Sequence, residues 1–391
     1  MKTELGSLKT VFAPAKPEKE ATPLSPAPVD EVHPALRSKD RNPRLSANWL
    51  PYFFREKLVY CDSNYRVHVK TKISESDVAA AGRFSDGMAR ILLKSKDKIQ
   101  GNEYIDESGK IVIAPDANRE YAGPFSEGLA CILDAHSHKV GFIDKKGKQA
   151  IPFLFYVTET ASGVGVQKPQ QLENCIFAEG LAPVYNGKAN AADLTPCCGF
   201  IDHRGKFVIP PNFIEAFPFV EKRAQVCVRD NSQRRRRWGF IDSKGKMQVK
   251  ATYMEVQSYS QGLAAVLDYL GKWGYIDLNG NYVIPAKFYD ALPFSEGFAA
   301  VAITKDDKPQ WGYIRKNGEW LADAQFERAE SFFNGEARAS NGYDEKSKKS
   351  KVEFRITKRG KIEKYADGLL PFDVSNLQIL DDDNLEPSSA N

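Results

Sequence analysis

Short runs of alternating apolar and polar residues fill the chain from about residue 82 to residue 362. Residues 272–294 (KWGYIDLNGNYVIPAKFYDALPF) show the pattern best, with two apolar runs separated by an Asn-Gly turn. Alternation with a period of two is typical of a half-buried β-strand. A further run keeps small or branched residues at its outer positions and varies between them: Ala89-Arg-Ile, Ala130-Cys-Ile, Ala182-Pro-Val, Ala224-Gln-Val, Ala264-Ala-Val, Ala299-Ala-Val and Ala337-Arg-Ala.

An Asp-x-x-Gly motif separates the second apolar run from the third in most units. Aspartate can accept hydrogen bonds from a turn backbone, and glycine supplies the positive φ that closes a hairpin. Proline follows the third run in several units, where a missing N–H does least harm, and we expect it to end that strand. Each unit is therefore predicted to be a three-stranded antiparallel meander. The prolines are Pro115, Pro152, Pro210 and Pro285.

The units recur about every 40 residues, which is typical of a repeat architecture. Two sets of glycines mark seven copies in register. One longer interval, between Gly147 and Gly205, predicts an insertion at about residues 153–175. The turn glycines are Gly109, Gly147, Gly205, Gly245, Gly280, Gly318 and Gly360, and the second set is Gly87, Gly128, Gly180, Gly262, Gly297 and Gly335.

The regions that flank the array differ from it in composition. Residues 49–80 begin with an aromatic segment, WLPYFFRE, and we interpret them as a cap followed by a degenerate repeat. Residues 81–362 form the array. Residues 1–48 are rich in proline and residues 363–391 end in an acidic tail, and both are predicted to be disordered because they hold few large apolar groups.

The repeated motifs F-S-E-G-L-A, W-G-[FY]-I-D-x-x-G-K and V-I-P resemble those of the WG-repeat family. The pair that gives the family its name is present as Trp238-Gly239, Trp273-Gly274 and Trp311-Gly312. The early copies depart from it, with Asn102, Val140 and Cys198 at the tryptophan position and Glu103 at the first glycine. The resemblance implies an all-β array used for interaction, without a shared active site.

We expect an all-β fold of about seven three-stranded repeats in an elongated or superhelical stack. A closed seven-bladed propeller is the alternative. The stack is preferred because propeller blades normally have four strands and because the insertion in the third copy breaks the regularity of the array. Trp-Gly is interpreted as an inter-repeat packing pair, since tryptophan is a large anchor and glycine lets a neighbouring backbone approach. A ligand-binding row of aromatic side chains is the alternative interpretation.

The composition fits a folded cytoplasmic protein. Hydrophobic residues make up 42% of the chain, and the net charge is +4. The six cysteines have no CxxC spacing, which favours reduced thiols, and no run is long enough for a signal peptide or a membrane span.

Basic residues cluster in the connections between strands. The clearest cluster is Arg234, Arg235, Arg236 and Arg237, and the corresponding connection of the last copy holds Lys346, Lys348, Lys349 and Lys351. Equivalent loops of a repeat array lie on the same edge, so we expect a basic rim that suits an anionic partner. The alternative is that charged hairpin tips only keep this edge soluble.

No pattern of catalytic or metal-binding residues stands out. His136 and His138 lack a further ligand at suitable spacing, and Cys198 near His203 occupies the tryptophan position of its copy. We therefore predict no cofactor, no metal and no enzymatic activity. The preferred function is a scaffold that binds a protein. Binding of nucleic acid or another anionic surface is the alternative, and a hydrolase or carbohydrate site in the insertion is a remote one.

Overall fold

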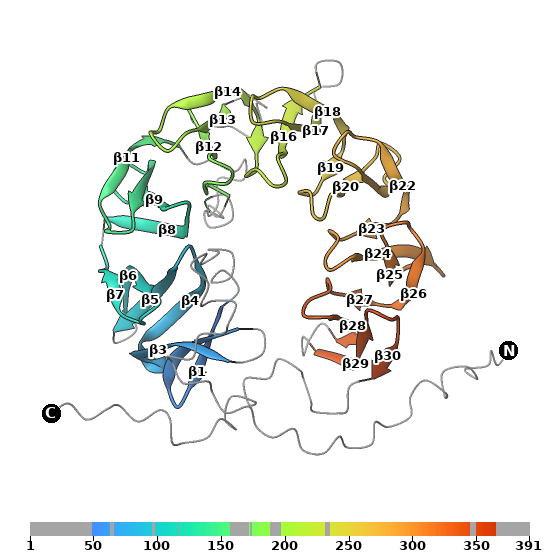
Figure 1. The fold of residues 1–391 in the computed structure, drawn as a ribbon, viewed down its shortest axis with the longest axis horizontal. Coiled ribbons are helices and arrows are strands. Elements are labelled where there is room, and N and C mark those ends of the chain that lie inside the picture. The colour runs from blue at the N-terminus through green and yellow to red at the C-terminus, as the bar shows by residue number, and fades with distance from the viewer. Residues whose placement is uncertain are drawn as a thin grey trace, which may run out of the picture. The chain divides into compact units, whose positions relative to one another are not determined.

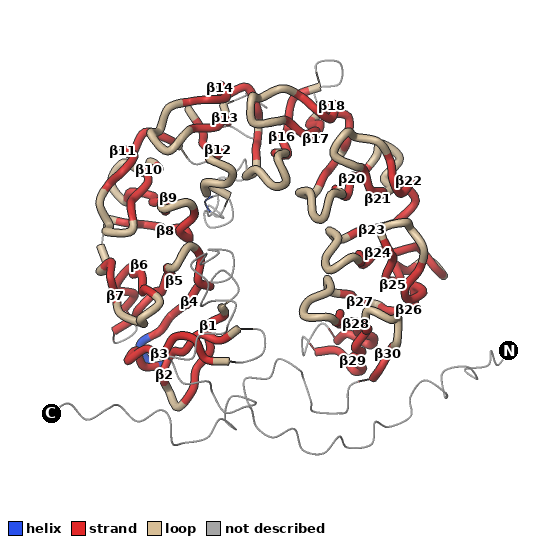
Figure 2. The backbone as a smooth tube through the Cα atoms, in the orientation of Figure 1, coloured by secondary structure: helices blue, strands red, loops and turns tan. Residues whose placement is uncertain are grey.

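A computed structural model of the chain describes residues 49–62, 66–95, 98–116, 118–156, 172, 174–187, 197–230, 235–344 and 349–364. The predicted leader, most of the insertion and the tail from residue 365 lie outside these ranges. The described chain falls into two compact units, an N-terminal unit (49–213) and a C-terminal unit (214–364). Figures 1 and 2 show strands and turns in both units. The N-terminal unit also contains a short 3-10 helix, η3 (Glu75–Asp77), coloured blue beside β3 in Figure 2.

The N-terminal unit holds four antiparallel sheets, which follow one another along the chain. The first corresponds to the predicted degenerate copy and the others to the first three repeats. Their strands are β1 (Leu50–Phe54), β2 (Lys57–Cys61) and β3 (Val67–Ser74); β4 (Val78–Ser85), β5 (Met88–Ser95), β6 (Lys98–Asp106) and β7 (Ile111–Ile113); β8 (Arg119–Ser126), β9 (Leu129–Asp134), β10 (Val140–Asp144) and β11 (Gln149–Phe155); and β12 (Ala182–Tyr185), β13 (Cys198–Ile201) and β14 (Phe207–Phe213).

The C-terminal unit holds the last four repeats, each an antiparallel sheet of four strands in chain order. Their strands are β15 (Glu215–Ala216), β16 (Ala224–Arg229), β17 (Arg236–Ile241) and β18 (Met247–Tyr253); β19 (Glu255–Val256), β20 (Ala264–Leu267), β21 (Trp273–Ile276) and β22 (Tyr282–Phe288); β23 (Asp290–Ala291), β24 (Phe298–Lys305), β25 (Lys308–Arg315) and β26 (Trp320–Phe326); and β27 (Arg328–Ala329), β28 (Glu336–Asp344), β29 (Lys349–Thr357) and β30 (Ile362–Lys364).

The strand count differs from the predicted three. Six of the eight described sheets have four strands, because a further strand at the start of the repeat pairs with the Ala-x-Val strand. This first strand has eight residues in β4 and in β8. In the C-terminal unit this first strand is only two residues long, too short to show alternation. The predicted count of three strands was one reason for preferring a stack over a propeller, and this reason is removed. The choice between a stack and a propeller stays a prediction.

The predicted Asp-x-x-Gly hairpins are confirmed. In the unit of Asp277, the N–H of Gly280 donates to the carbonyl of Asp277 at 3.0 Å, and the Asp277 carboxylate accepts from the N–H groups of Asn279 and Asn281, both at 2.9 Å. The same geometry recurs at Asp144 and Asp202. In these repeats the aspartate therefore closes the turn that precedes the outer strand.

These turn aspartates predict a loss of stability in acid. The hydrogen bond from the N–H of Asn281 is the main cause that holds the pKa of Asp277 below its ordinary value, and the N–H of Lys206 acts likewise on the pKa of Asp202. A carboxyl group whose pKa is lower in the folded state stabilises the fold at pH values above its unfolded-state pKa. This stabilisation is lost as the pH falls through the folded-state pKa. We expect the free energy of unfolding to drop below about pH 4. Chemical denaturation should show a weaker drop for Asp277→Asn, which keeps an acceptor oxygen without titrating. An equal drop in both proteins would contradict the assignment.

The glycine of each Trp-Gly pair lies against the backbone of the outer strand. A Cβ on Gly274 would lie 2.7 Å from the nitrogen of Ala286 and 2.8 Å from the oxygen of Ile284. The pairing of β21 with β22 shifts register on both sides of Tyr275, so the outer strand bulges over the glycine. Pro285 lies within this strand, at the bulge, and does not end it as predicted.

Within each unit, the core lies between successive sheets, and each sheet shares an apolar cluster with the next one of that unit. One such cluster joins Trp273 and Tyr275 of one sheet to Ala299, Val301 and Ile314 of the following sheet. Trp273 is only 6% exposed. The Trp-Gly pair is thus a packing feature in this sheet, as predicted.

The F-S-E-G turns form a second connection between neighbouring sheets. Glu296 and Gly297 both have positive φ, and Ser295 and Phe298 exchange two backbone hydrogen bonds, as in a two-residue type I′ hairpin. The acidic or amide side chain of each turn accepts from the glycine N–H of the next turn. The pairs are Asp86 with Gly128, Glu127 with Gly180, Glu221 with Gly262, Gln261 with Gly297 and Glu296 with Gly335.

Candidate functional site

The arginine cluster lies at the hairpin that joins β16 to β17, and its members differ in environment. Arg234 lies outside the described residues. Arg235 is exposed, and Arg237 is part-buried and donates to the carbonyl of Arg236 at 3.1 Å. Arg236 forms an ion pair with Glu215 and donates from Nε to the Cys227 sulfur at 3.4 Å. Arg236 therefore holds its own sheet together, which leaves Arg235 and Arg237 as the described candidates for a partner.

The Arg236 contacts run across three strands of one sheet. Its guanidinium also lies over the Trp238 ring, 5.8 Å from the centroid. Burial raises the pKa of the Cys227 thiol although Arg236 opposes that shift, so Cys227 stays a neutral thiol at pH 7. The geometry supports a structural arginine here rather than an activated cysteine.

The other predicted basic connections are hairpin tips as well. The backbone of Lys349 pairs with the backbone of Asp344 at the start of β29, and Lys351 lies on the same strand. Lys346 and Lys348 lie outside the described residues. Lys305 and Lys308 flank Asp306 and Asp307, which form the turn of the β24–β25 hairpin, and all four residues are exposed. This tip therefore carries as many acidic as basic side chains. In the described part of the C-terminal unit, the three connections occupy equivalent positions of three of the four sheets.

The last sheet carries charged residues where the preceding sheet is apolar. Backbone register places Glu336, Arg338, Arg355 and Glu363 at the positions of Phe298, Ala300, Tyr313 and Ala322, which are all buried in one cluster, and Glu353 at the position of Trp311. We name these five residues the terminal charged face. Their side chains are between 22% and 44% exposed.

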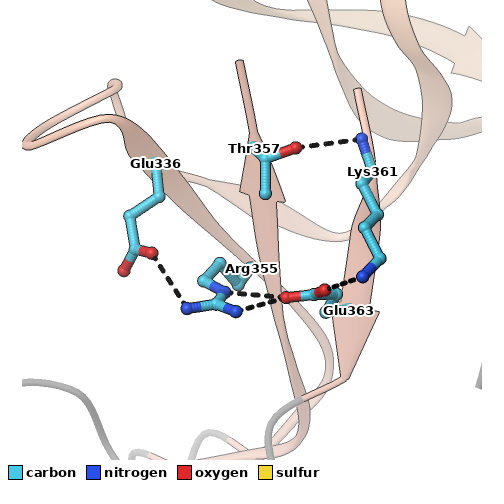
Figure 3. A network of polar contacts seen from close by, with 5 residues as sticks. All are labelled: Glu336, Arg355, Thr357, Lys361 and Glu363. Carbon is cyan, nitrogen blue, oxygen red and sulfur yellow. Dashed lines mark hydrogen bonds and ion pairs between the residues drawn. The ribbon is translucent and has the colours of Figure 1, made fainter. Parts of the chain in front are cut away.

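Ion pairs connect the terminal charged face. Figure 3 shows Arg355 between Glu336, at 3.5 Å, and Glu363, which also pairs with Lys361. Arg338 pairs with Glu353 at 2.9 Å. Hydrogen bonds from Lys361 and Arg355 hold the pKa of Glu363 below its ordinary value, so it stays ionised at neutral pH. A sheet face of this kind suits the end of a repeat array, where a polar outer surface is required.

A cavity of about 370 Å³ lies between the last two sheets. We name it the terminal pocket. Apolar walls come from Trp311 of β25, Ala329 of β27 and Ala339 of β28, which belong to one apolar cluster. The full lining is Trp311, Arg328, Ala329, Glu330, Arg338, Ala339, Ser340 and Glu353.

A tyrosine hydroxyl fixes the backbone beside this pocket. The Tyr313 hydroxyl donates to the carbonyl of Arg338 at 2.8 Å and also contacts the carbonyl of Glu330 at 3.0 Å. Burial raises the pKa of Tyr313 well above its ordinary value, so the hydroxyl stays a neutral donor. The pocket is thus a gap between two sheets that are themselves held in place.

The histidines and cysteines considered as metal ligands lie apart. His138 pairs with Glu120 at 3.0 Å, and His203 pairs with Glu127 at 3.2 Å and stacks on Phe177. Within the described ranges no group of three or more His, Cys, Asp or Glu side chains could hold a metal ion. Over the same ranges, no helix has the length and apolar character to cross a bilayer.

Some of these features were visible in the sequence and some were not. The arginine cluster was visible in the sequence. Its partners Glu215 and Cys227 were not visible, because the pairing of β15 with β16 brings them together. The terminal pocket was missed. Its lining combines Trp311 of one sheet with residues of the next, so no single stretch of sequence contains it.

Comparisons with known proteins agree with this fold. The family model described as "WG containing repeat" matches residues 104–133, 199–231, 238–268, 273–305 and 311–343. No curated protein sequence matches the chain.

Among solved structures, one titled "Crystal structure of the eukaryotic initiation factor" is similar at a TM-score of 0.53 and 11% identity, over 82% of this chain and 86% of that chain. BamB from Moraxella catarrhalis matches at a TM-score of 0.37 and 10% identity, over 81% and 84% of the two chains. The C-terminal WD40 domain of Sif2 matches at 0.36 and 9%, over 70% and 79%. With β-sheets that follow one another as repeats and five matched copies of the motif, this chain is a WG-repeat protein.

Proposed function

We propose that this repeat protein is a non-enzymatic scaffold that binds another macromolecule, in the first place a protein. One observation carries the proposal: the recurring positions of each repeat are used in sheet-to-sheet packing, whereas the hairpin tips differ from repeat to repeat. A shared framework with variable tips is how repeat proteins build extended binding surfaces. A cytoplasmic location is proposed with it, and the six buried free cysteines are compatible with a reducing compartment.

Affinity capture tests the scaffold proposal. The full chain should retain a defined set of proteins from its own cell extract. Reversing the charge of four tip residues (Arg235→Glu, Arg237→Glu, Lys305→Glu and Lys308→Glu) should remove some of them while the fold persists. An unchanged set of captured proteins would reject the hairpin tips as the binding surface.

Binding of an anionic partner, such as a nucleic-acid backbone, is the second candidate function. Exposed Arg235 and part-buried Arg237 favour it. Each phosphate that a basic side chain neutralises releases condensed counterions, so affinity should fall steeply with salt.

A salt titration distinguishes this second function. We expect binding of a duplex DNA probe to weaken in the double variant Arg235→Ser/Arg237→Ser. The slope of log affinity against log salt should decrease in magnitude by about 2, roughly one for each lost phosphate contact. Arg236 is left in place because it pairs with Glu215. Lys250→Ser, an exposed site on outer strand β18, is the matched control. An equal effect of the control, or salt-insensitive binding, would reject the proposal.

A further inference from the structure

Large apolar side chains gather in solvent at one end of the sheet formed by β19 to β22. Met254 precedes β19, and its N–H donates to the carbonyl of Leu267 at 2.9 Å. Tyr289 follows β22 at the same end of the sheet, and the hairpin that joins β20 to β21 turns there at Tyr269 and Leu270. We name the four exposed side chains the apolar rim: Met254 (46% exposed), Tyr269 (77%), Leu270 (67%) and Tyr289 (51%). Single exposed apolar side chains are common, but a group of them at one end of a sheet is the kind of patch that marks a binding site.

The turn at the centre of the apolar rim is fixed by its own backbone. The Asp268 carboxylate accepts from the N–H groups of Leu270 and Lys272, both at 2.9 Å. Gly271 has a positive φ of 73°, and its N–H donates to the carbonyl of Asp268 at 3.2 Å. Tyr269 and Leu270 are therefore held at the corner of an ordered turn. A partner that binds them does not have to order this loop first, which removes one of the ordinary costs of association.

The two neighbouring hairpins of the C-terminal unit are longer than the one that carries this turn. Beyond the pair of Leu267 with Trp273, backbone pairing continues for one residue pair in the β20–β21 hairpin. It continues for three residue pairs beyond the equivalent position in both the β16–β17 and the β24–β25 hairpins. Each pair adds about 3.4 Å, so the flanking hairpins extend roughly 7 Å further than the turn. A flat bilayer would meet the flanking tips first, whereas a protein segment that fits between them reaches the apolar rim.

The two flanking hairpins differ in charge. Arg235 and Arg237 make the β16–β17 side basic, and the ion pair of that sheet involves Arg236 instead. The tip of the β24–β25 hairpin carries two lysines and two aspartates, which cancel one another. Acidic side chains of a partner are therefore favoured on one side of the apolar rim only. Charge of this kind sets the direction in which a segment binds more than the strength of its binding.

We propose that the apolar rim binds an exposed segment of a partner protein that carries a large apolar side chain with acidic residues on one side of it. The apolar side chain contacts Tyr269 and Leu270 between the two longer hairpins, and the acidic residues lie toward Arg235 and Arg237. Tyrosine and arginine are among the residues that dominate the binding energy of protein interfaces. This inference rests on the proposed scaffold function and states the chemistry of one partner segment.

Peptide selection on the full chain tests the proposal. A phage library of random short peptides is first depleted on the double variant Tyr269→Ser/Leu270→Ser and then selected on the original chain. We expect the enriched peptides to combine a large apolar residue with aspartate or glutamate. A synthetic copy of the most enriched peptide should bind the double variant at least about tenfold more weakly than the original chain. Arg235→Ser/Arg237→Ser should weaken its binding by a similar factor and make the remaining binding less sensitive to salt.

A matched control separates the apolar rim from other exposed apolar residues. Leu154→Ser/Val283→Ser removes two exposed apolar side chains from the outer strands β11 and β22 and should leave peptide binding unchanged. Both double serine variants should unfold at the temperature of the original chain, because the replaced side chains are exposed. A selection without enrichment, enriched peptides that lack acidic residues, or equal affinity for the original chain and the Tyr269→Ser/Leu270→Ser variant would overturn the proposal.

Two further outcomes distinguish this inference from its alternatives. The original chain should not sediment with vesicles of phosphatidylcholine and phosphatidylserine. Sedimentation that is lost in Tyr269→Ser/Leu270→Ser would overturn the protein partner and assign the apolar rim to a membrane surface. If the same double variant captures an unchanged set of proteins from cell extract, the apolar rim has no part in partner binding and the scaffold function still stands.

Discussion

Gly274→Ala should lower the free energy of unfolding of the C-terminal unit by about 3 kcal/mol, the upper range for overpacking a well-packed site. The added Cβ would lie under 3 Å from the nitrogen and Cα of Ala286 and from the oxygen of Ile284. These are backbone atoms, which cannot rotate away as a flexible side chain does. We expect the outer strand β22 to detach beyond its first residues, and amide exchange in residues 284–288 to accelerate.

A comparison within the chain supports this expectation. Glu103 stands at the glycine position of the first repeat, and its outer strand β7 is three residues long (Ile111–Ile113), whereas β22 has seven residues. Gly187→Ala is the matched control, because a Cβ there meets nothing within 4 Å. Denaturant unfolding that affects both variants equally, or normal protection in β22 of Gly274→Ala, would show that close approach is not the role of this glycine.

The repeats were predictable from sequence because their signals are local. The run Ala264-Ala265-Val266 marks a strand, and Asp277 with Gly280 marks a turn that uses only neighbouring backbone groups. Such local patterns can be recognised in one repeat without reference to the others. They recovered the order of the sheets and the packing role of Trp273. The prediction that strand β20 is half-buried was wrong, because both of its faces are packed: Ala264 and Val266 belong to one apolar cluster and Ala265 to another.

What was missed depends on pairing between distant residues. The first strand of each repeat in the C-terminal unit spans two residues, such as Asp290–Ala291, and is defined only by its partner strand β24. The bulge around Gly274 likewise carries Pro285 inside the strand rather than at its end. A two-residue strand is too short to show alternation, so it was left out of the predicted strand count of these repeats. The bulge likewise leaves no alternation that would place a proline inside a strand.

The candidate surfaces were only partly predictable for the same reason. Four adjacent arginines are visible in any sequence, but Arg236 is removed from the binding set by Glu215 and Cys227. The terminal pocket is lined by Trp311 of one sheet and by residues of the next, and these lie apart in the sequence.

Replacing the terminal charged face by the residues of the preceding sheet should make the protein self-associate. The changes are Glu336→Phe, Arg338→Ala, Glu353→Trp, Arg355→Tyr and Glu363→Ala, which copy Phe298, Ala300, Trp311, Tyr313 and Ala322. In the preceding sheet, four of those five residues are buried in the core shared with the last sheet, and Trp311 packs against it. An apolar patch of several hundred Å² marks an association site in soluble proteins.

Analytical ultracentrifugation measures the outcome, with an expected dissociation constant of about micromolar for the redesigned chain. The matched control reverses the ion pairs of Figure 3 and keeps the face polar: Glu336→Arg, Arg355→Glu and Glu363→Arg. This control should sediment like the original chain, because opposite charges still meet across β28, β29 and β30. If the redesigned chain also sediments unchanged, charge on this face does not limit association, and its ion pairs serve only the stability of the last sheet.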